Sequence, residues 1–397
     1  MKAGCNILMY SHDTYGLGHI RRTMAIATHL AGPDTNVLIL TGSPLVGRFS
    51  VPDQIDFVRI PGMIKMTNEE YLPLSIKINP KHALDIRKNI IKATAKTFQP
   101  KLFIVDKEPL GLKKEVLPTL KWLKRSLPGA KAILGLRDIM DDAATTRSDW
   151  ENKGVYQAMD ELYSEVWVYG MQDFYDPVKE YGIPESIAKK MTFTGYIPRR
   201  VPDKKSVRKI RTKNGLCAED KLVVVTAGGG GDGYVVMDTF LKLLENESQE
   251  LPFKTVFITG PFMPKEQRDQ ITDRARRIGV RAWHFYRRME EILAAADVVV
   301  SMGGYNTVCE ILSQGTVGLI IPRDNPRKEQ LIRAKLLKER KMADYLEWGE
   351  LTPAHLKRKV LELLEKPEPY LNAMSEFQLT GLSVMSRRIE AFRNREP

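Results

Sequence analysis

The stretch ADVVVSMGGYNTVCE, residues 296–310, contains in one place the pattern that predicts the fold. Its β-branched run Val298–Ser301 predicts a short buried strand, and the small residues after it predict a tight turn into a helix over Thr307–Gln314. A strand that leads through glycines directly into a helix is the repeating unit of a doubly wound α/β sheet. Such sheets bind ligands at the carboxyl ends of their strands, so the stretch also predicts a ligand site.

The same alternation continues on both sides of this stretch and predicts a parallel sheet. Strands are expected at Leu222–Thr226, Thr255–Thr259, Val280–Phe285, Val298–Ser301 and Val317–Ile321. Helices are expected at Tyr234–Glu245, Pro264–Ile278, Met289–Ala296, Thr307–Gln314, Lys328–Glu339 and Pro353–Leu364, and a last helix after Pro369 is expected to extend to about Phe392.

The first half of the chain carries a second series of the same kind. Strands are expected at Cys5–Ser11, Asn36–Thr41, Asp56–Ile60, Lys101–Asp106, Ala130–Leu136, Val166–Tyr169 and Met191–Gly195. Helices are expected at Arg21–Leu30, Lys81–Phe98, Leu112–Ser126 and Asp149–Leu162.

The proline-flanked stretch from Tyr196 through Pro202 has the composition of a linker between these two series. With 397 residues the chain is long enough for two domains. We therefore expect an α/β protein with two doubly wound, Rossmann-like domains facing a central cleft. Residues 1–197 form the N-terminal domain and 198–375 the C-terminal domain, and a helix within 376–397 could cross back to the N-terminal domain.

The composition is that of an ordinary globular protein except for its net charge of +12. A basic surface attracts nucleic acid, anionic lipid or phosphate-bearing ligands. No helix-turn-helix, zinc-finger or RNP signature is present, so no nucleic acid partner is expected. The basic residues between Arg199 and Lys213 are interpreted as a solvated helix face, with contact to a charged partner as the alternative.

The absence of several sequence patterns bears on the cellular location of the protein and on metal binding. There is no apolar run of about 18 residues, and Met1–Asp13 does not resemble a signal peptide, so a cytoplasmic protein is expected. Cys5, Cys217 and Cys309 are too widely spaced for a metal site and are interpreted as small buried hydrophobic residues. No D-x-D or H-x-x-x-H motif occurs, so neither a metal nor a cofactor is expected.

The segment Tyr15-Gly16-Leu17-Gly18-His19 follows the first predicted strand and opens a helix. Glycines at this position let backbone amides approach an anion or a sugar at the helix N-terminus. His19 can take up a proton near neutral pH, which makes it the strongest candidate for acid–base catalysis, against the alternative of a structural histidine. The segment is not G-x-G-x-x-G, so a dinucleotide site is not indicated.

The run Thr226–Gly233, TAGGGGDG, joins the first strand and helix of the second half. Its glycines, Gly228 to Gly231, expose backbone that a phosphate could approach; the alternative is a flexible surface loop. The run lacks the Lys-Ser/Thr ending of a P-loop, which argues against an ordinary kinase or NTPase.

The segment from Gly303 to Glu310 places a carboxylate one turn inside a helix. Glu310 could accept two hydrogen bonds from a vicinal diol such as a ribose, or it could be an acid that stabilises the helix N-terminus. Downstream, the loop Pro322–Gln330 offers Asn325, Glu329 and Gln330 to the same region.

Taken together, G-L-G-H-I-R-R near the start, T-A-G-G-G-G at mid-chain, residues 296–310 and the spacing from Pro322 to Gln330 resemble the MurG-like glycosyltransferases, which carry the family 28 C-terminal domain. The group includes the N-acetylglucosaminyltransferase that acts on a lipid-linked peptidoglycan precursor. The resemblance is strongest over Ala296–Leu336. It implies a GT-B fold, a UDP-sugar donor held mostly by the second domain, no required metal and inversion at the anomeric carbon.

The resemblance also implies roles for individual residues. His19 would be the base on the acceptor hydroxyl, Glu310 would bind the ribose, and Gln330 would contact the transferred sugar. The donor side would comprise Gly228, Gly229, Gly230, Gly231, Tyr286, Arg288, Met289, Gly303, Gly304, Asn306, Thr307, Glu310, Glu329 and Gln330. The acceptor side would comprise Tyr15, Gly16, Gly18, Asp106, Glu108, Arg137 and Asp138.

Two other functions remain open. The opening G-x-G-H-x-x-R also resembles the nucleotide-sugar hydrolase of pseudaminic acid synthesis, in which water is the acceptor, and a non-catalytic nucleotide-sugar-binding protein is a third possibility.

A membrane partner is also predicted. The stretch Ile64–Ile91 suggests contact with an anionic membrane on the way to a glycan or lipid-linked acceptor, against the alternative of core residues beside a solvated face. The residues behind this prediction are Met63, Ile64, Met66, Leu74, Lys65, Lys77 and Lys81.

Overall fold

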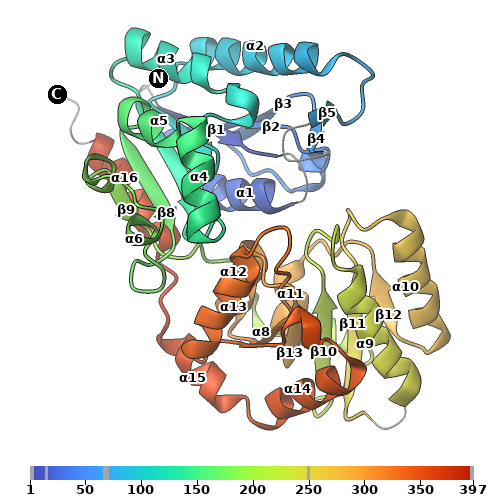
Figure 1. Cartoon of the computed structure of the whole chain (residues 1–397). Coiled ribbons are helices and arrows are strands. Elements are labelled where there is room, and N and C mark those ends of the chain that lie inside the picture. Colours follow the sequence, from blue (N-terminus) through green and yellow to red (C-terminus); the bar gives the residue numbers. More distant parts are fainter. Residues whose placement is uncertain (1–3, 14–16, 66–70, 248–250, 394–397) are drawn as a thin grey trace. The chain divides into compact units, whose positions relative to one another are not determined.

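The computed structural model describes residues 4–13, 17–65, 71–247 and 251–393, and the chain divides into two compact units. The first comprises Met1–Ile197 together with Thr380–Pro397, and the second comprises Pro198–Leu379. Tyr15, Gly16 and Met66, which the sequence analysis singled out, lie outside the described residues. Figure 1 labels the elements of both units.

The described strands of the first unit form a seven-stranded parallel sheet in the order β3-β2-β1-β6-β7-β8-β9. Its strands are β1 (Cys5–Ser11), β2 (Thr35–Thr41), β3 (Ile55–Arg59), β6 (Leu102–Asp106), β7 (Lys131–Arg137), β8 (Glu165–Tyr169) and β9 (Met191–Phe193). These agree with the predicted strands to within two residues. A short antiparallel pair, β4 (Met63–Lys65) and β5 (Tyr71–Pro73), was not predicted.

Helices cover both faces of this sheet (Figure 1). They are η1 (Val46–Arg48), η2 (Leu112–Lys114), α1 (Gly18–Leu30), α2 (Pro80–Phe98), α3 (Leu117–Ser126), α4 (Ala143–Lys153), α5 (Val155–Leu162), α6 (Pro177–Glu180) and α7 (Glu185–Ala188). Residues of α2, α3 and α5 pack with Leu8, Phe103 and Leu134 into one core cluster. The single helix predicted over Asp149–Leu162 is wrong, because Gly154, with φ +69°, ends α4 and α5 starts afterwards.

The single long helix predicted after Pro369 is also wrong, since the chain forms α15 (Glu368–Glu376) and then α16 (Gly381–Arg393). Helix α16 belongs to the first unit. The Thr380 hydroxyl donates to the carbonyl of Thr194 (2.9 Å), and Arg388 pairs with Glu165. At the start of the helix Gly381 lies against the backbone of Tyr196, so closely that a Cβ would come within 2.7 Å of its carbonyl oxygen.

The second unit repeats the architecture, with a six-stranded parallel sheet of described residues in the order β12-β11-β10-β13-β14-β15. Its strands are β10 (Lys221–Thr226), β11 (Phe253–Ile258), β12 (Arg281–Trp283), β13 (Val298–Ser301), β14 (Val317–Ile320) and β15 (Asp344–Tyr345). All but β15, which is only two residues long, were predicted.

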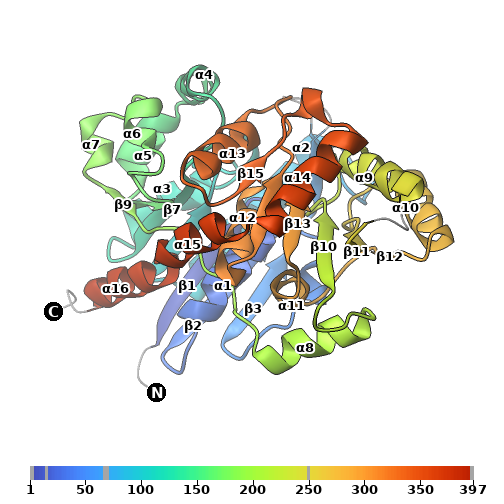
Figure 2. The same cartoon turned by 90° about the horizontal axis from the view of Figure 1, so that it is seen from below.

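Helices α9 (Tyr234–Glu247), α10 (Lys265–Arg277) and α14 (Pro353–Glu365) pack with the sheet residues Val223, Phe257 and Val300 into one core cluster. The other described helices of the unit are α8 (Lys204–Lys213), α11 (Met289–Ala294), α12 (Tyr305–Gln314), α13 (Glu329–Glu339), η3 (Trp348–Glu350) and α15 (Glu368–Glu376). In Figure 2, α9 and α14 lie on one side of β10 and β13, and α8 and α11 lie on the other.

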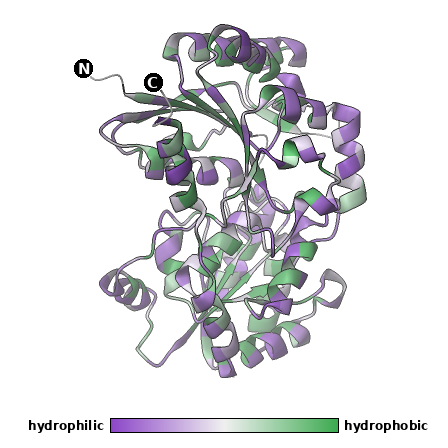
Figure 3. Ribbon diagram, turned by 90° about the vertical axis from the view of Figure 1, so that its left-hand side faces the viewer, coloured by the Kyte–Doolittle hydropathy of each residue, from purple (hydrophilic) through white to green (hydrophobic). Residues whose placement is uncertain are grey.

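Hydrophobic residues concentrate in the strands of both sheets, while the outer faces of the helices are hydrophilic (Figure 3). Cys5 and Cys309 are buried as predicted, but Cys217 is exposed because it lies in the turn that leads into β10. None of the described helices combines the length and apolar character needed to span a lipid bilayer.

Candidate functional site

In the first unit, polar side chains gather where β1 and β6 end. The register pairs Tyr10 of β1 with Val105 of β6, so Ser11 and Asp106 finish these neighbouring strands side by side. The chain leaves β1 through His12 and Asp13, and helix α1 begins at Gly18 with His19 in its first turn. The strand-to-helix turn therefore brings His19 to the end of β6.

His19 and Asp106 form a close pair. Nδ1 of His19 lies 2.5 Å from Oδ2 of Asp106. Arg22, one turn further along α1, donates from Nε and Nη2 to the same carboxylate at 2.7–2.9 Å. Both charged partners are buried, at 5% exposure for the Asp106 side chain and 2% for that of Arg22. The sequence analysis placed His19 and Asp106 in different roles; the structure joins them.

The protonation states of this pair suit proton transfer. Burial lowers the pKa of His19 to about 4, although Asp106 acts in the opposite direction. Burial also opposes ionisation of Asp106, but Arg22 and His19 outweigh it and hold the pKa of that carboxyl below its usual range. At neutral pH a neutral imidazole therefore faces a carboxylate. Its proton sits on Nδ1, which donates to Asp106, and the lone pair of Nε2 is left to accept a proton.

Arg22 and Tyr169 are functional candidates that the sequence analysis missed. The guanidinium of Arg22 lies 5.5 Å from the centre of the Tyr169 ring, within cation–π range. The Tyr169 hydroxyl occupies space over Gly135 that a Cβ would fill. The motif G-H-x-x-R was the available signal for Arg22, since a three-residue spacing places His19 and Arg22 on one helix face.

The other predicted acceptor-side residues have diverse surroundings. Glu108 pairs with Lys107 (3.3 Å) directly after β6. Arg137, half-buried, ends β7. Asp138 is fully buried, and it accepts hydrogen bonds from the Tyr196 hydroxyl and from the amide of Ile139 (2.7 Å). Gly18 opens α1. Asp106 is the member of this group whose side chain pairs with His19.

In the second unit, β10 and β13 are also neighbours, and Thr226 pairs with Ser301 at their ends. The glycine run follows β10, with positive φ at Gly228 (+61°) and Gly230 (+95°). A Cβ at Gly230 would overlap the carbonyl oxygen of Thr259, so the loop packs tightly on the segment after β11. The glycine run is thus closely packed against the segment after β11, which argues against the alternative of a flexible surface loop.

The loop after β13 lies beside this glycine run. A Cβ at Gly228 would be 3.4 Å from the hydroxyl of Thr307. Gly303 adopts φ +72° against Ile320, and its carbonyl accepts a hydrogen bond from the fully buried Arg333 (3.2 Å). Arg333 was not predicted, because nothing in its local sequence distinguishes it from a surface arginine of α13.

Helix α12 begins at Tyr305, two residues earlier than predicted. Gly304 therefore caps it, while Asn306, Thr307 and Glu310 all lie within it. Glu310 is 1% exposed, so its carboxylate is a buried group in the second turn of the helix.

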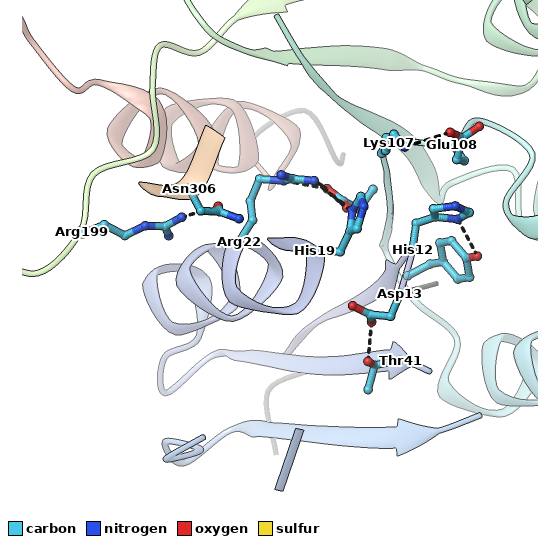
Figure 4. A network of polar contacts seen from close by, with 11 residues as sticks. His12, Asp13, His19, Arg22, Thr41, Lys107, Glu108, Arg199 and Asn306 are labelled. Carbon is cyan, nitrogen blue, oxygen red and sulfur yellow. Dashed lines mark hydrogen bonds and ion pairs between the residues drawn. The ribbon is translucent and has the colours of Figure 1, made fainter. Parts of the chain in front are cut away.

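The assignment of Arg199 to a solvated helix face is wrong, because this residue precedes helix α8 and is buried. It is 8% exposed, and its Nη2 donates to Oδ1 of Asn306 at 2.7 Å (Figure 4). Within the described part of the chain it forms no ion pair, and its Nε has no hydrogen-bond partner. A buried cation thus lies beside the N-terminus of α12, where the helix dipole is also positive. Both features give this end of α12 a positive potential that favours binding of an anion.

The loop after β14 connects to the same region. Arg323 pairs with Asp232 of the glycine run (3.2 Å) and with Glu329 (3.0 Å), and its amide donates to Oε1 of Gln330 (3.1 Å). Glu329 and Gln330 are both buried at the start of α13. The three loops that carry predicted donor residues are therefore linked, mainly through the side chains of Arg323 and Arg333.

The remaining donor candidates follow β12. Tyr286 is half-buried and lies edge-on to Trp283, with ring centres 5.9 Å apart. Arg288 is exposed and pairs with Glu291 (3.1 Å), whereas the side chain of Met289 is buried as α11 begins. Among the described residues there is no group of three or more His, Cys, Asp or Glu side chains that could hold a metal ion.

Comparisons with known proteins identify the second half of the chain. Residues 223–389 match the glycosyltransferase family 28 C-terminal domain. This match covers less than half of the chain, and it includes the glycine run, α12 and the loop with Gln330.

A curated relative supports the same assignment. It is the UDP-N-acetylglucosamine--N-acetylmuramyl-(pentapeptide) pyrophosphoryl-undecaprenol N-acetylglucosamine transferase of Streptococcus equi subsp. equi, which is 37% identical over 101 residues. That match spans 23% of this chain and only 28% of the relative.

Solved glycosyltransferase structures share the fold of this protein over nearly the whole chain. MurG of Acinetobacter baumannii has a TM-score of 0.60 at 14% identity and covers 98% of this chain and 99% of its own. A UDP-glucosyltransferase from Polygonum tinctorium has a TM-score of 0.66 at 11% identity, with 99% and 100% covered. The predicted GT-B fold and the resemblance to MurG-like proteins are confirmed.

Proposed function

We propose that this protein is an inverting, metal-independent glycosyltransferase that moves a sugar from a UDP-sugar to a hydroxyl acceptor in cell-envelope or polysaccharide synthesis. The observation that carries the proposal is the 2.5 Å contact between His19 and Asp106. The contact fixes the tautomer of the imidazole, and burial keeps the ring neutral, as a general base requires. The family 28 domain supports the donor class, since the curated relative in Streptococcus is named for a UDP-sugar substrate.

In the proposed reaction, Nε2 of His19 removes the proton of the acceptor hydroxyl as its oxygen attacks the anomeric carbon. The bond from that carbon to the diphosphate oxygen breaks, and the diphosphate leaves with the electron pair. A single displacement of this kind inverts the anomeric carbon. Asp106 stabilises the imidazolium that forms, and Arg22 keeps the Asp106 carboxylate in position.

The donor is assigned to the second unit. The amides at the start of α12 and the buried Arg199 would face the charge that develops on the leaving diphosphate, which is the contribution a metal makes in other enzymes. Glu310 would bind the ribose and Gln330 the sugar, while the backbone around Tyr286 to Met289 would border the base.

Isothermal titration with a panel of nucleotide diphosphates and their sugars tests this function, followed by product analysis without added acceptor. Micromolar binding of UDP or a UDP-sugar with slow hydrolysis supports the transferase. Rapid hydrolysis would instead favour the hydrolase, in which the same base activates water. Binding without any turnover, even with candidate acceptors, would favour the non-catalytic binder, and no binding at all would overturn the donor assignment.

We also propose that the first unit contacts an anionic membrane surface, at the cytoplasmic face, through residues 74–86. Four of the seven exposed large hydrophobic side chains among the described residues are Leu74, Ile76, Ile78 and Ile86. Lys77 and Lys81 are exposed between them, which suits a surface of anionic lipid. Met63 does not take part, because it is buried in a small core cluster with Ala83 and Leu112.

Liposome flotation tests the membrane contact. Vesicles with anionic lipid should bind the protein, high salt should weaken binding, and Ile76→Glu should abolish it. Val235→Glu is the matched control, since Val235 is equally exposed at 46% but lies in the second unit. Equal flotation of both variants would refute the assignment.

A further inference from the structure

A second histidine, His12, lies at the end of β1, held by a buried polar network. The hydroxyl of Tyr10 donates to Oε1 of Glu115 at 2.5 Å, and Nδ1 of His12 lies 3.2 Å from the same hydroxyl. Arg87 binds both oxygens of Glu115 at 2.5–2.6 Å. Tyr10, Glu115 and Arg87 are all fully buried, so this support is shielded from water.

The hydrogen bonds of this network fix the tautomer of His12. Burial and Glu115 raise the pKa of Tyr10 well above its usual value, so the hydroxyl keeps its one proton and gives it to the carboxylate. The Tyr10 oxygen can then only accept, from the amide of Leu112 (3.3 Å) and from Nδ1–H of His12. Burial keeps His12 neutral by lowering its pKa well below its usual value. Nε2 of His12 is consequently an acceptor.

His19 is held in the same tautomer, because its Nδ1–H donates to Asp106. The two rings are neighbours, with centres 5.6 Å apart and planes at 83° (Figure 4). Among the described residues, neither Nε2 has a hydrogen-bond donor. The site therefore presents two obligate acceptors on neighbouring rings whose centres are 5.6 Å apart, and a ligand with two O–H donors on adjacent atoms complements them.

We infer that His12 is an acceptor-binding residue: its Nε2 receives a hydrogen bond from a hydroxyl adjacent to the one that His19 deprotonates, so the acceptor is a vicinal diol, such as a sugar. This inference rests on the proposed function. It assigns a substrate contact to a residue outside the glycine motif and distinguishes a sugar or other polyol from an acceptor with an isolated hydroxyl.

The test uses the tightest-binding UDP-sugar of the titration panel and lets water compete with 1,2-propanediol or 1-propanol at equal concentration, with products quantified by mass spectrometry. The wild-type protein should favour the diol over the mono-alcohol by about three- to tenfold, the effect of one neutral hydrogen bond. His12→Asn retains a donor near the position of Nδ1 but loses the distal acceptor, so the preference should fall to about one. His12→Gln carries an oxygen near the position of Nε2 and should restore it.

The outcomes separate this inference from the function on which it rests. If the wild-type protein releases no UDP under any condition, the proposed function fails. If it turns over but shows no diol preference, or forms only the hydrolysis product, the vicinal-diol assignment is refuted while the donor chemistry stands. If His12→Asn retains the preference for the diol, or if His12→Gln does not restore it, the inference is refuted. His12 then supports Tyr10 and does not touch the acceptor.

Discussion

In both units two neighbouring parallel strands end side by side, but the residues gathered at these ends differ in charge. At the end of β1 and β6 the first unit gathers ionised side chains that are already paired: Asp106 with Arg22, and Glu115 with Arg87. At the end of β10 and β13 the second unit presents glycine backbone, and beside it lies the buried cation Arg199, for which the described residues supply no carboxylate.

This difference shows how one architecture divides the work of a reaction. A base must keep a defined protonation state before substrate arrives, so its neighbours are fixed by internal charge pairs. A diphosphate site needs positive potential that the ligand itself neutralises, so the described residues give Arg199 the amide of Asn306 but no anionic partner. In the first site, Asp106 and Glu115 are balanced by arginines without any ligand. In the second site, the charge of Arg199 is balanced only when an anion binds.

The largest expected effect is on catalysis in the first unit. His19→Ala should lower kcat by about 10²- to 10⁴-fold, the contribution of a positioned base, while the Kd for UDP measured by titration stays unchanged. The exposed His82 provides the control variant His82→Ala, which should leave both quantities unaltered. An equal loss of UDP affinity in His19→Ala would show that His19 is not confined to the chemical step.

The next effect is on stability and tests whether the first site depends on its internal pairs. Arg87→Met leaves Glu115 buried and unpaired, which should lower the free energy of unfolding by about 3–5 kcal/mol. Chemical denaturation measures the change. Lys153→Met, which breaks an exposed pair with Asp149, should cost no more than about 1 kcal/mol. Similar losses in the two variants would contradict the comparison.

Arg199→Gln examines the opposite property in the second unit. Glutamine can still donate to Asn306, but it removes the charge, so the affinity for UDP should fall about 10- to 100-fold. The free energy of unfolding should not decrease, because no internal anion loses its partner. Arg200→Gln, on the exposed neighbouring residue, should retain the wild-type Kd. Loss of stability without loss of UDP affinity would assign Arg199 a structural role.

The smallest effect concerns Asp13, the one carboxyl at the end of β1 that has no cation partner among the described residues. Burial raises the pKa of Asp13 to about 6, and Thr41 donates to its Oδ2 (2.5 Å). Since the folded protein binds this proton more tightly than the unfolded chain does, the stability due to it is lost as pH rises from about 4 to about 6.

Asp13→Asn cannot ionise and escapes this loss. It should therefore match the wild type near pH 4 and exceed it by roughly 2 kcal/mol at pH 7.5 in denaturant unfolding. Asp85→Asn, on an exposed residue of α2, is the control and should show no such pH-dependent gain. A variant less stable than the wild type at pH 7.5 would mean that the Asp13 carboxylate is compensated within the fold.

Much of the fold followed from local sequence because strand and helix periodicity survives in single segments. Six of the seven strands of the first sheet were placed to within one residue at each end, and residues 296–310 form the predicted strand, turn and helix. The short elements were missed: β15 has two residues, too few for a periodic signal, and Gly154 divides a helix that composition alone would continue.

For the site, the sequence by itself indicated His19, the glycine run and the residues around α12, because glycines and a histidine at strand-to-helix turns are local signals. Only the tertiary structure paired His19 with Asp106, 87 positions away. It also brought Arg22 to Tyr169, and it connected His12 through Tyr10 to the buried pair of Glu115 and Arg87. It also decided that Arg199 is buried beside α12, while neighbouring basic residues remain solvated. Partners distant in sequence are chosen by strand order and register, and burial is set by what packs above a residue, so neither can be derived from the residue's own neighbours in the chain.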